Sequence, residues 1–172
     1  MKKYLVTGLS GTGKSTIAKE LQNRGSYAVD TDKADGLCRW INIDTGKGVK
    51  HKPNDKKWYE KNHLVWDKSE MLRIFQKTDQ GNIFICGSSY NDSEFYNLFD
   101  KIFFLVVDKE ALVSRLGGRH GKQFGKNEIE LTEILKWHKK INYSKLAARF
   151  RGKVIDAALP PSKIADQILA QT

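Results

Sequence analysis

The feature that most constrains this chain is the segment GLSGTGKS at positions 8–15, a complete match to the pattern G-x-x-x-x-G-K-S/T. An apolar run at residues 4–7 precedes it, and Ile17, Ala18 and Leu21 follow it at helical spacing. The motif therefore stands between an expected strand and an expected helix. Glycines there let backbone N–H groups turn toward a phosphate, and the helix N-terminus adds a favourable dipole.

This motif predicts a binding site for a nucleoside triphosphate with Mg²⁺. Lys14 is expected to reach the β- and γ-phosphates, and Ser15 is expected to hold Mg²⁺. A fortuitous glycine-rich turn is the competing interpretation. The residues expected to contact the nucleotide within this segment are Gly8, Ser10, Gly11, Thr12, Gly13, Lys14, Ser15 and Thr16.

The rest of the chain alternates apolar runs with amphipathic segments. Continuous apolar runs at 83–86 and 102–107 are typical of strands buried on both faces, and shorter strands are expected at 26–29 and 154–155. Helices are expected at 15–24, 55–77 (one long or two short), 92–99, 108–116, 127–141 and 162–169. The pattern predicts an α/β fold with a doubly wound, mostly parallel five-stranded sheet and helices on both faces.

The length of 172 residues with 40% hydrophobic content predicts one domain, residues 1–172. Residues 33–54 lack periodicity and, with 55–77, are expected to form an insert at 33–77 that binds an acceptor. Helical spacing of Trp58 and Trp66 favours core packing over an aromatic pocket. Residues 117–127 are glycine-rich and basic, so a lid is expected there that orders when ligands bind.

The net charge of +10 favours phosphate-rich partners, including nucleotides, nucleic acids and anionic lipids, although a solvated basic surface explains it equally well. Two cysteines and four histidines make neither a disulfide framework nor a metal cage, so both thiols are expected to be reduced. No run approaches about 18 continuous apolar residues. A soluble, cytoplasmic protein that does not engage a membrane is expected.

Two carboxylates, Asp30 and Asp32, follow the second expected strand at the carboxyl edge of the sheet, where ligands bind in open α/β folds. One residue apart on an extended strand end, they point to the same side. One could accept the proton of an acceptor hydroxyl, and the other could hold Mg²⁺ through water. A turn or helix cap is the alternative interpretation.

The P-loop, the Asp-x-Asp after the second strand and a later segment with glycines and arginines resemble the P-loop kinases of the shikimate kinase, gluconate kinase and adenylate kinase superfamily. The order of elements is similar over nearly the whole chain, whereas only the P-loop is specific in its letters. The resemblance implies that Asp30 serves the metal and Asp32 contacts the acceptor hydroxyl.

The same resemblance implies that Arg115 and Arg119 act as lid arginines that neutralise charge during phosphoryl transfer. Solvated arginines at a helix end are the alternative. It also implies that Arg119 and Pro160 border the adenine, although Pro160 equally suits a helix start. The turn at residues 86–89 is expected to hold substrate, or to be only a tight turn at the sheet edge.

One departure is that no acidic residue follows Ile85 in the usual Walker B place, which counts against a motor or AAA-type ATPase. The sequence predicts a kinase that uses ATP and Mg²⁺ and acts on a small-molecule hydroxyl or phosphate of a metabolite, nucleoside or nucleotide. One alternative is a polynucleotide 5′-hydroxyl kinase, whose substrate suits the basic charge. Another is a regulatory ATPase that binds a protein or RNA partner without phosphorylating it.

Overall fold

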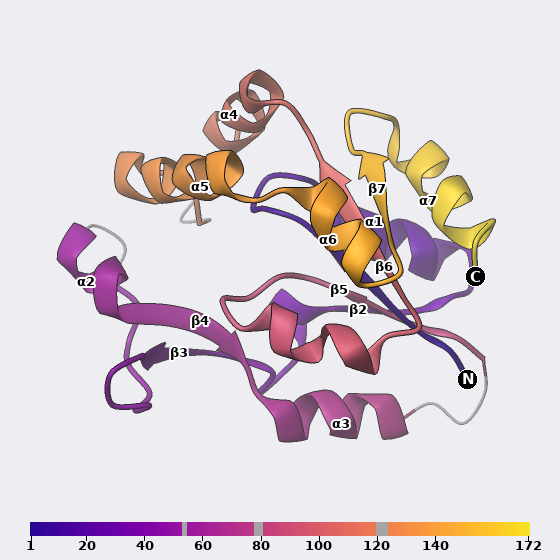
Figure 1. Ribbon diagram of the computed structural model, residues 1–172, viewed down its shortest axis with the longest axis horizontal. Helices are drawn as coiled ribbons and strands as arrows, with labels where there is room; N and C mark the ends of the chain where they lie inside the picture. Colours follow the sequence, from indigo (N-terminus) through magenta and orange to yellow (C-terminus); the bar gives the residue numbers. More distant parts are fainter. Residues whose placement is uncertain (53–54, 78–80, 120–123) are drawn as a thin grey trace.

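The computed structural model describes residues 1–52, 55–77, 81–119 and 124–172, and its centre is a twisted sheet (Figure 1). The predicted α/β fold is confirmed, because this sheet has five strands, all parallel, in the order β2-β5-β1-β6-β7. Its strands are β1 (Lys3–Thr7), β2 (Tyr27–Asp30), β5 (Ile83–Cys86), β6 (Lys101–Val106) and β7 (Gly152–Asp156).

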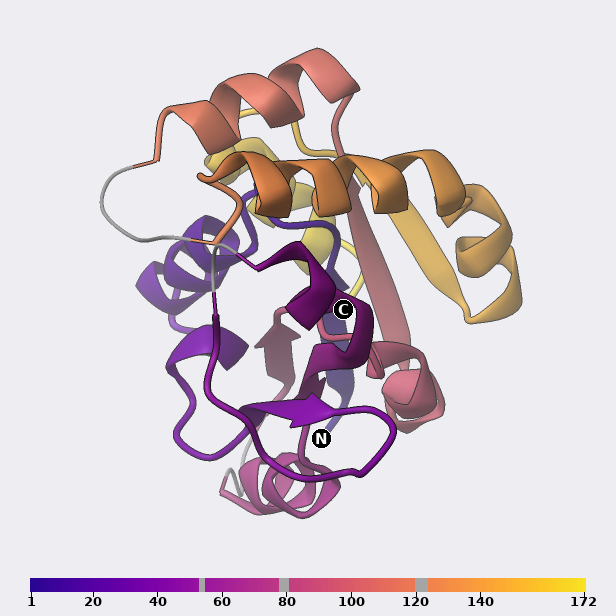
Figure 2. The ribbon, with the colours of Figure 1, turned by 90° about the vertical axis from the view of Figure 1, so that its left-hand side faces the viewer.

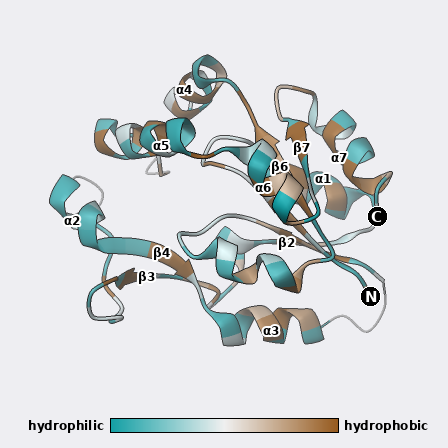
Figure 3. Ribbon diagram, in the orientation of Figure 1, coloured by the Kyte–Doolittle hydropathy of each residue, from teal (hydrophilic) through white to brown (hydrophobic). Residues whose placement is uncertain are grey.

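Helices cover both faces of the sheet, and alternate side chains of β1 pack against the helices on opposite faces. Tyr4 and Val6 pack in one apolar cluster with α1 (Lys14–Asn23) and α7 (Pro161–Leu169). Leu5 points the other way, into a cluster with α3 (Lys68–Gln76) and the 3-10 helix η2 (Asp92–Leu98). Successive strand residues face opposite sides, so a strand covered on both faces must be apolar throughout. Figure 3 shows these central strands as the most hydrophobic part of the molecule.

The insert differs from the sequence prediction. The irregular segment expected at 33–54 contains β3 (Cys38–Asn42), and the helix expected through 55–77 is interrupted by β4 (Asn62–Trp66), which pairs antiparallel with β3. Only α2 (Lys56–Lys61) and α3 are helical there. The helical spacing of the large apolar residues in 55–77 was misleading, because the apolar residues of 62–66 fit a strand as well as a helix. Pairing with β3 selects the strand. Trp58 and Trp66 are buried, as the core-packing interpretation predicted.

The second half of the chain adds three helices, α4 (Lys109–Gly117), α5 (Glu128–Lys140) and α6 (Tyr143–Arg149). Helix α5 begins after Asn127, whose side chain accepts a hydrogen bond from the Glu130 N–H. Trp137, expected in its apolar stripe, is instead 44% exposed, and the sequence had not indicated α6. Figure 2 shows α5 lying across the molecule above α2 and β4 of the insert. Within the described residues, no helix has the length and apolar character needed to span a membrane.

Close packing at Gly87 brings the segment after β5 against the end of β2. The Gly87 N–H donates to the carbonyl oxygen of Val6 at 3.0 Å. A Cβ at Gly87 would lie 1.8 Å from Oγ1 of Thr31, which is closer than any real side chain can approach. The absence of a side chain at this position therefore lets Gly87 lie directly against Thr31, between Asp30 and Asp32 in the chain.

We expect Gly87→Ala to lower the free energy of unfolding by about 1–3 kcal/mol, because overpacking forces neighbouring groups to shift. For a chain of this size the Tm should fall by roughly 2–12 °C in thermal unfolding followed by circular dichroism. Gly117→Ala is the matched control, since a Cβ there meets no atom within 4 Å. Equal Tm values for the two variants would show that the contact with Thr31 does not constrain the fold.

Candidate active site

The P-loop leaves β1 at the centre of the sheet and leads directly into α1. Its three glycines, Gly8, Gly11 and Gly13, have φ values of 150°, 94° and 97°, a backbone region that L-residues rarely adopt. Gly13 is the N-cap of α1 and offers no side chain to its first-turn N–H groups, and this turn contains no acidic residue. The loop and helix start therefore present backbone donors to an anion.

Lys14 is folded back onto the loop that precedes it. Its ammonium donates hydrogen bonds to the carbonyl oxygens of Gly8, at 2.7 Å, and of Leu9, at 2.9 Å. Burial lowers the pKa of Lys14 to about 8, against the opposing attraction of the Asp32 carboxylate. Near pH 7 the ammonium is therefore mainly charged and already placed in the loop, held by carbonyl oxygens that a phosphate could replace.

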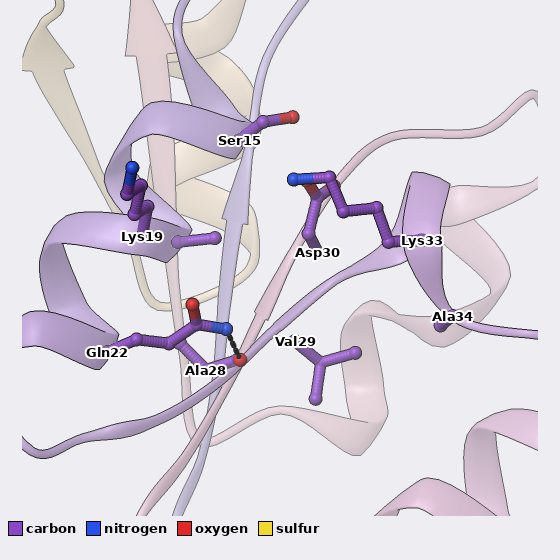
Figure 4. A pocket seen from close by; sticks show the side chains of 9 residues that line it. Ser15, Lys19, Gln22, Ala28, Val29, Asp30, Lys33 and Ala34 are labelled. Carbon is purple, nitrogen blue, oxygen red and sulfur yellow. Dashed lines mark hydrogen bonds and ion pairs between the residues drawn. The ribbon is translucent and has the colours of Figure 1, made fainter.

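Ser15 and Asp30, the two predicted metal ligands, line one hollow of about 480 Å³ between α1 and the end of β2 (Figure 4). Asp30 is buried, and its Oδ2 has no hydrogen-bond donor among the described residues. The only cation at this oxygen in the described part of the chain is the Lys33 ammonium, at 3.3 Å. A hydroxyl and an unsatisfied carboxylate oxygen next to the P-loop fit Mg²⁺, which takes few protein ligands and keeps substrate phosphates and waters.

Asp32 has a different environment from Asp30. It lies in the short 3-10 helix η1 (Thr31–Lys33) rather than on an extended strand, and its side chain is exposed. The Asp30 carboxylate accepts a hydrogen bond from the Asp32 N–H at 3.3 Å, so the helix-cap alternative is realised at Asp30. The charge of Asp32 acts on both Lys14 and Arg119. An exposed carboxylate is thus close enough to the P-loop lysine and to an arginine for its charge to act on both.

The two predicted lid arginines lie in different places. Arg119 donates to the Ser10 hydroxyl of the P-loop at 3.0 Å and to the carbonyl oxygen of Phe124. Arg115 instead donates to the Ala157 carbonyl oxygen, at 2.8 Å, in the loop after β7. Pro160 ends that loop as the N-cap of α7, as its alternative interpretation suggested. Residues 120–123 of the predicted lid lie outside the described residues.

Sequence reasoning missed Asp92, the first residue of η2. Its carboxylate accepts hydrogen bonds from the Thr7 hydroxyl, at 3.4 Å, and from the Tyr96 hydroxyl, at 3.2 Å. Burial raises the pKa of Asp92 to about 6, although the nearby Lys14 ammonium opposes this shift. Residues 87–91 separate Asp92 from the end of β5, so Asp92 does not follow its strand directly as Asp30 and Asp32 do. Its place at the start of an expected helix, after a strand that ends at the carboxyl edge of the sheet, was the signal that could have identified it.

Glu130 is a second missed residue, and it joins the insert to Gly125 of the predicted lid. Only 2% exposed, it accepts hydrogen bonds from the Tyr59 hydroxyl and from the Gly125 N–H, both at 2.7 Å. The His51 Nε2 lies 3.5 Å from the same carboxylate. Tyr59 and His51 belong to a group of rings that contact one another, formed by Trp40, His51, Trp58, Tyr59 and Phe124. The sequence shows Glu130 only as an acidic residue in the first turn of a helix, so its burial was not foreseeable.

Comparisons with known proteins agree with this architecture. Residues 5–136 match a family model described as an AAA domain. No curated protein matches the chain.

Solved structures with a similar fold include a deoxyadenosine kinase from M. mycoides with bound dATP, at 18% identity and a TM-score of 0.57, covering 99% of this chain and 98% of that one. A sugar kinase from Janibacter sp. HTCC2649 has 15% identity, a TM-score of 0.58 and coverages of 99% and 93%. A gluconokinase from Sinorhizobium meliloti 1021 has 16% identity, a TM-score of 0.55 and coverages of 98% and 90%. The chain thus has the fold of small-molecule P-loop kinases, which confirms the resemblance seen in the sequence.

We expect the Lys14 ammonium to titrate near pH 8 in the nucleotide-free protein, because burial disfavours its charged form. Bound phosphate favours the charged form of Lys14, so nucleotide should raise its pKa. The affinity for nucleotide should therefore fall as pH rises above about 8, by up to about tenfold per pH unit. Lysine ¹³Cε NMR would follow the titration, with Lys14→Arg identifying the signal by its loss. Calorimetry between about pH 7.5 and 9.5 would follow the affinity. A free-state pKa near the ordinary lysine value would contradict this account.

Proposed function

This chain belongs to the AAA domain family, and we propose that it is a phosphotransferase that uses ATP and Mg²⁺ and acts on a small-molecule hydroxyl or phosphate. The observation that carries the proposal is the phosphate cradle at residues 8–15, which lies beside a buried carboxylate, Asp30, and an exposed one, Asp32. The structural neighbours support the class of acceptor, since their names describe kinases of a nucleoside, a sugar and gluconate. A metabolite, a nucleoside or a nucleotide is therefore the acceptor we propose.

Donor binding is assigned to the P-loop and the start of α1. The backbone of residues 8–13 surrounds the triphosphate, and the Lys14 ammonium exchanges its bonds with Gly8 and Leu9 for the β- and γ-phosphates. Ser15 and Asp30 would hold Mg²⁺, which neutralises charge on the phosphate oxygens when bound. Thr16 adds its N–H and hydroxyl to the same helix terminus.

Acceptor activation is assigned to Asp32. Its exposed carboxylate takes the proton of the acceptor hydroxyl as that oxygen bonds to the γ-phosphorus and the bond to ADP breaks. Arg119 already lies at the P-loop through Ser10, so its guanidinium is placed to neutralise the charge of the group in transit. Asp92 holds Thr7 and faces the charge of Lys14, and we assign it the positioning of that ammonium.

The base of the nucleotide is assigned to the side of the sheet where β7 ends. Arg115 fixes the loop before Pro160 through the Ala157 carbonyl oxygen. We propose that this loop borders the adenine and that Arg115 acts there by holding the loop, while Arg119 serves the phosphates. In this scheme residues 1–172 form one kinase domain, with the acceptor bound by the insert at 33–77 and a lid at 117–127.

We expect Asp32→Asn to lower kcat by at least about a hundredfold while leaving nucleotide affinity within about twofold, because the lost base acts on the acceptor and not on the triphosphate. Steady-state kinetics with the identified acceptor, alongside nucleotide titration, would measure both. Asp35→Asn is the matched control, since Asp35 is also exposed and lies three residues further on, in the loop after η1. A parallel loss of nucleotide affinity would make Asp32 a metal-site residue instead.

A screen with γ-labelled ATP tests the proposed function itself. It should cover nucleosides, nucleotides, sugars, sugar acids and 5′-hydroxyl oligonucleotides, with Lys14→Ala as the inactive reference. A labelled product with one class of small molecule supports the proposal. Slow ATP hydrolysis without any phosphorylated product would overturn it in favour of a regulatory ATPase.

A further inference from the structure

Three rings from distant parts of the chain meet on the surface beside the candidate active site. The rings of His63 and Tyr90 are stacked with centroids 3.9 Å apart and planes 3° apart. Trp137 meets Tyr90 edge-on, with centroids 6.4 Å apart. Tyr90 is 48% exposed and Trp137 is 44% exposed, although both are large rings. We call this set of three residues the ring surface.

The ring surface is held firmly in place. The Tyr90 N–H donates to the Leu64 carbonyl oxygen of β4 at 2.8 Å. Asn91 next to it accepts a bond from the Trp66 N–H and donates one to the Trp66 carbonyl oxygen. Burial lowers the pKa of His63, so this ring supports Tyr90 as a neutral group at pH 7. A rigid aromatic surface binds a planar ligand with little loss of side-chain entropy.

Its location borders the acceptor side of the site. Tyr90 is two residues before Asp92, whose carboxylate contacts Thr7 at the start of the P-loop. Trp137 is seven residues after Glu130, about two helical turns, so both lie on one face of α5. That face meets the insert at Tyr59 through Glu130. Through Trp137 it meets Tyr90, which lies outside the insert but is stacked on His63 of β4. Figure 2 shows α5 and the insert facing each other across this side of the molecule.

One lysine lies against the exposed rings: the Lys140 ammonium is 5.8 Å from the centre of the Trp137 ring. Lys139 is also exposed, but two residues after Trp137 it projects from the other side of α5. Within the described residues, neither of these lysines forms an ion pair with a carboxylate, whereas Lys136 pairs with Glu133. Lys61, which precedes β4, is exposed but pairs with Asp44 at 3.4 Å, so Lys140 is the lysine that the rings offer to a ligand. The whole chain carries a net charge of +10. Exposed rings with a lysine at their border match a base and its adjoining phosphate in a single strand.

We propose that the ring surface, together with Lys140, binds single-stranded nucleic acid. Bases stack on Tyr90 and Trp137, and the Lys140 ammonium neutralises an adjoining phosphate. This proposal does not depend on phosphoryl transfer, because it rests on rings and a charge outside the P-loop.

The test is fluorescence anisotropy with a 3′-fluorescein-labelled oligo(dT) of about 12 nucleotides carrying a 5′-hydroxyl. Binding should weaken steeply between about 50 and 200 mM salt, because phosphate contacts release counterions. Trp137→Ala and Tyr90→Ala should each weaken it by roughly five- to a hundredfold, since one stacked base is lost. Tyr27→Ala is the matched control, because Tyr27 is 40% exposed but begins β2 at the amino edge of the sheet. Nucleotide titration of every variant checks that the P-loop and the fold are intact.

Failure of this proposal can be told apart from failure of the proposed function. The proposal is overturned if the oligonucleotide does not bind at low salt, or if both ring variants bind it as tightly as the Tyr27→Ala control. Phosphorylation of a small molecule without oligonucleotide binding would leave only the kinase proposal standing. Salt-sensitive, ring-dependent binding without any phosphorylated product would leave only the nucleic-acid proposal standing.

Discussion

The central position of β1, hydrogen-bonded to β5 on one side and to β6 on the other, is the constraint on which the rest of the site depends. Because all strands are parallel, the P-loop emerges at the carboxyl edge, where the chain also turns after β2 and β5. The Thr31 side chain at that edge leaves no room for a side chain at Gly87. The phosphate cradle, the Asp30–Asp32 segment and Asp92 are therefore brought together by sheet topology before any ligand arrives.

Burial and charge oppose each other at this edge. Burial moves the pKa of Lys14 down to about 8 and that of Asp92 up to about 6, while the attraction between the two groups acts against both shifts. Between these values both groups are mainly charged, so the pair carries no net charge. A triphosphate changes that balance, since it adds negative charge next to Lys14 and strengthens the ammonium form. The P-loop thus holds a charged Lys14 ready for an anion, and Asp92 balances that charge until the anion binds.

Local patterns in the sequence determined what could be predicted. The P-loop and the five core strands were predicted because each is specified by a short run of residues. The β3–β4 pair, the exposed Trp137 and the positions of Asp92 and Glu130 were not, because pairing and burial depend on residues far along the chain. The missing acid after Ile85 counted against a motor or AAA-type ATPase, and that interpretation of the activity stays a prediction although the chain matches a family model described as an AAA domain. The site roles of Asp32, Arg115 and Pro160 remain predictions.

Helix α5 connects the two ends of the proposed site. At its start, Glu130 accepts hydrogen bonds from Tyr59 of the insert and from Gly125, the residue after Phe124, whose carbonyl oxygen receives Arg119. A buried carboxylate that loses one of these donors bears a desolvation cost, so the two donors favour each other's presence. Any ligand that shifts the insert at Tyr59 therefore acts on the backbone that holds Arg119 near Ser10. If the insert binds the acceptor as proposed, this one buried side chain would link the acceptor side to the phosphate side, and α5 would have a role beyond packing.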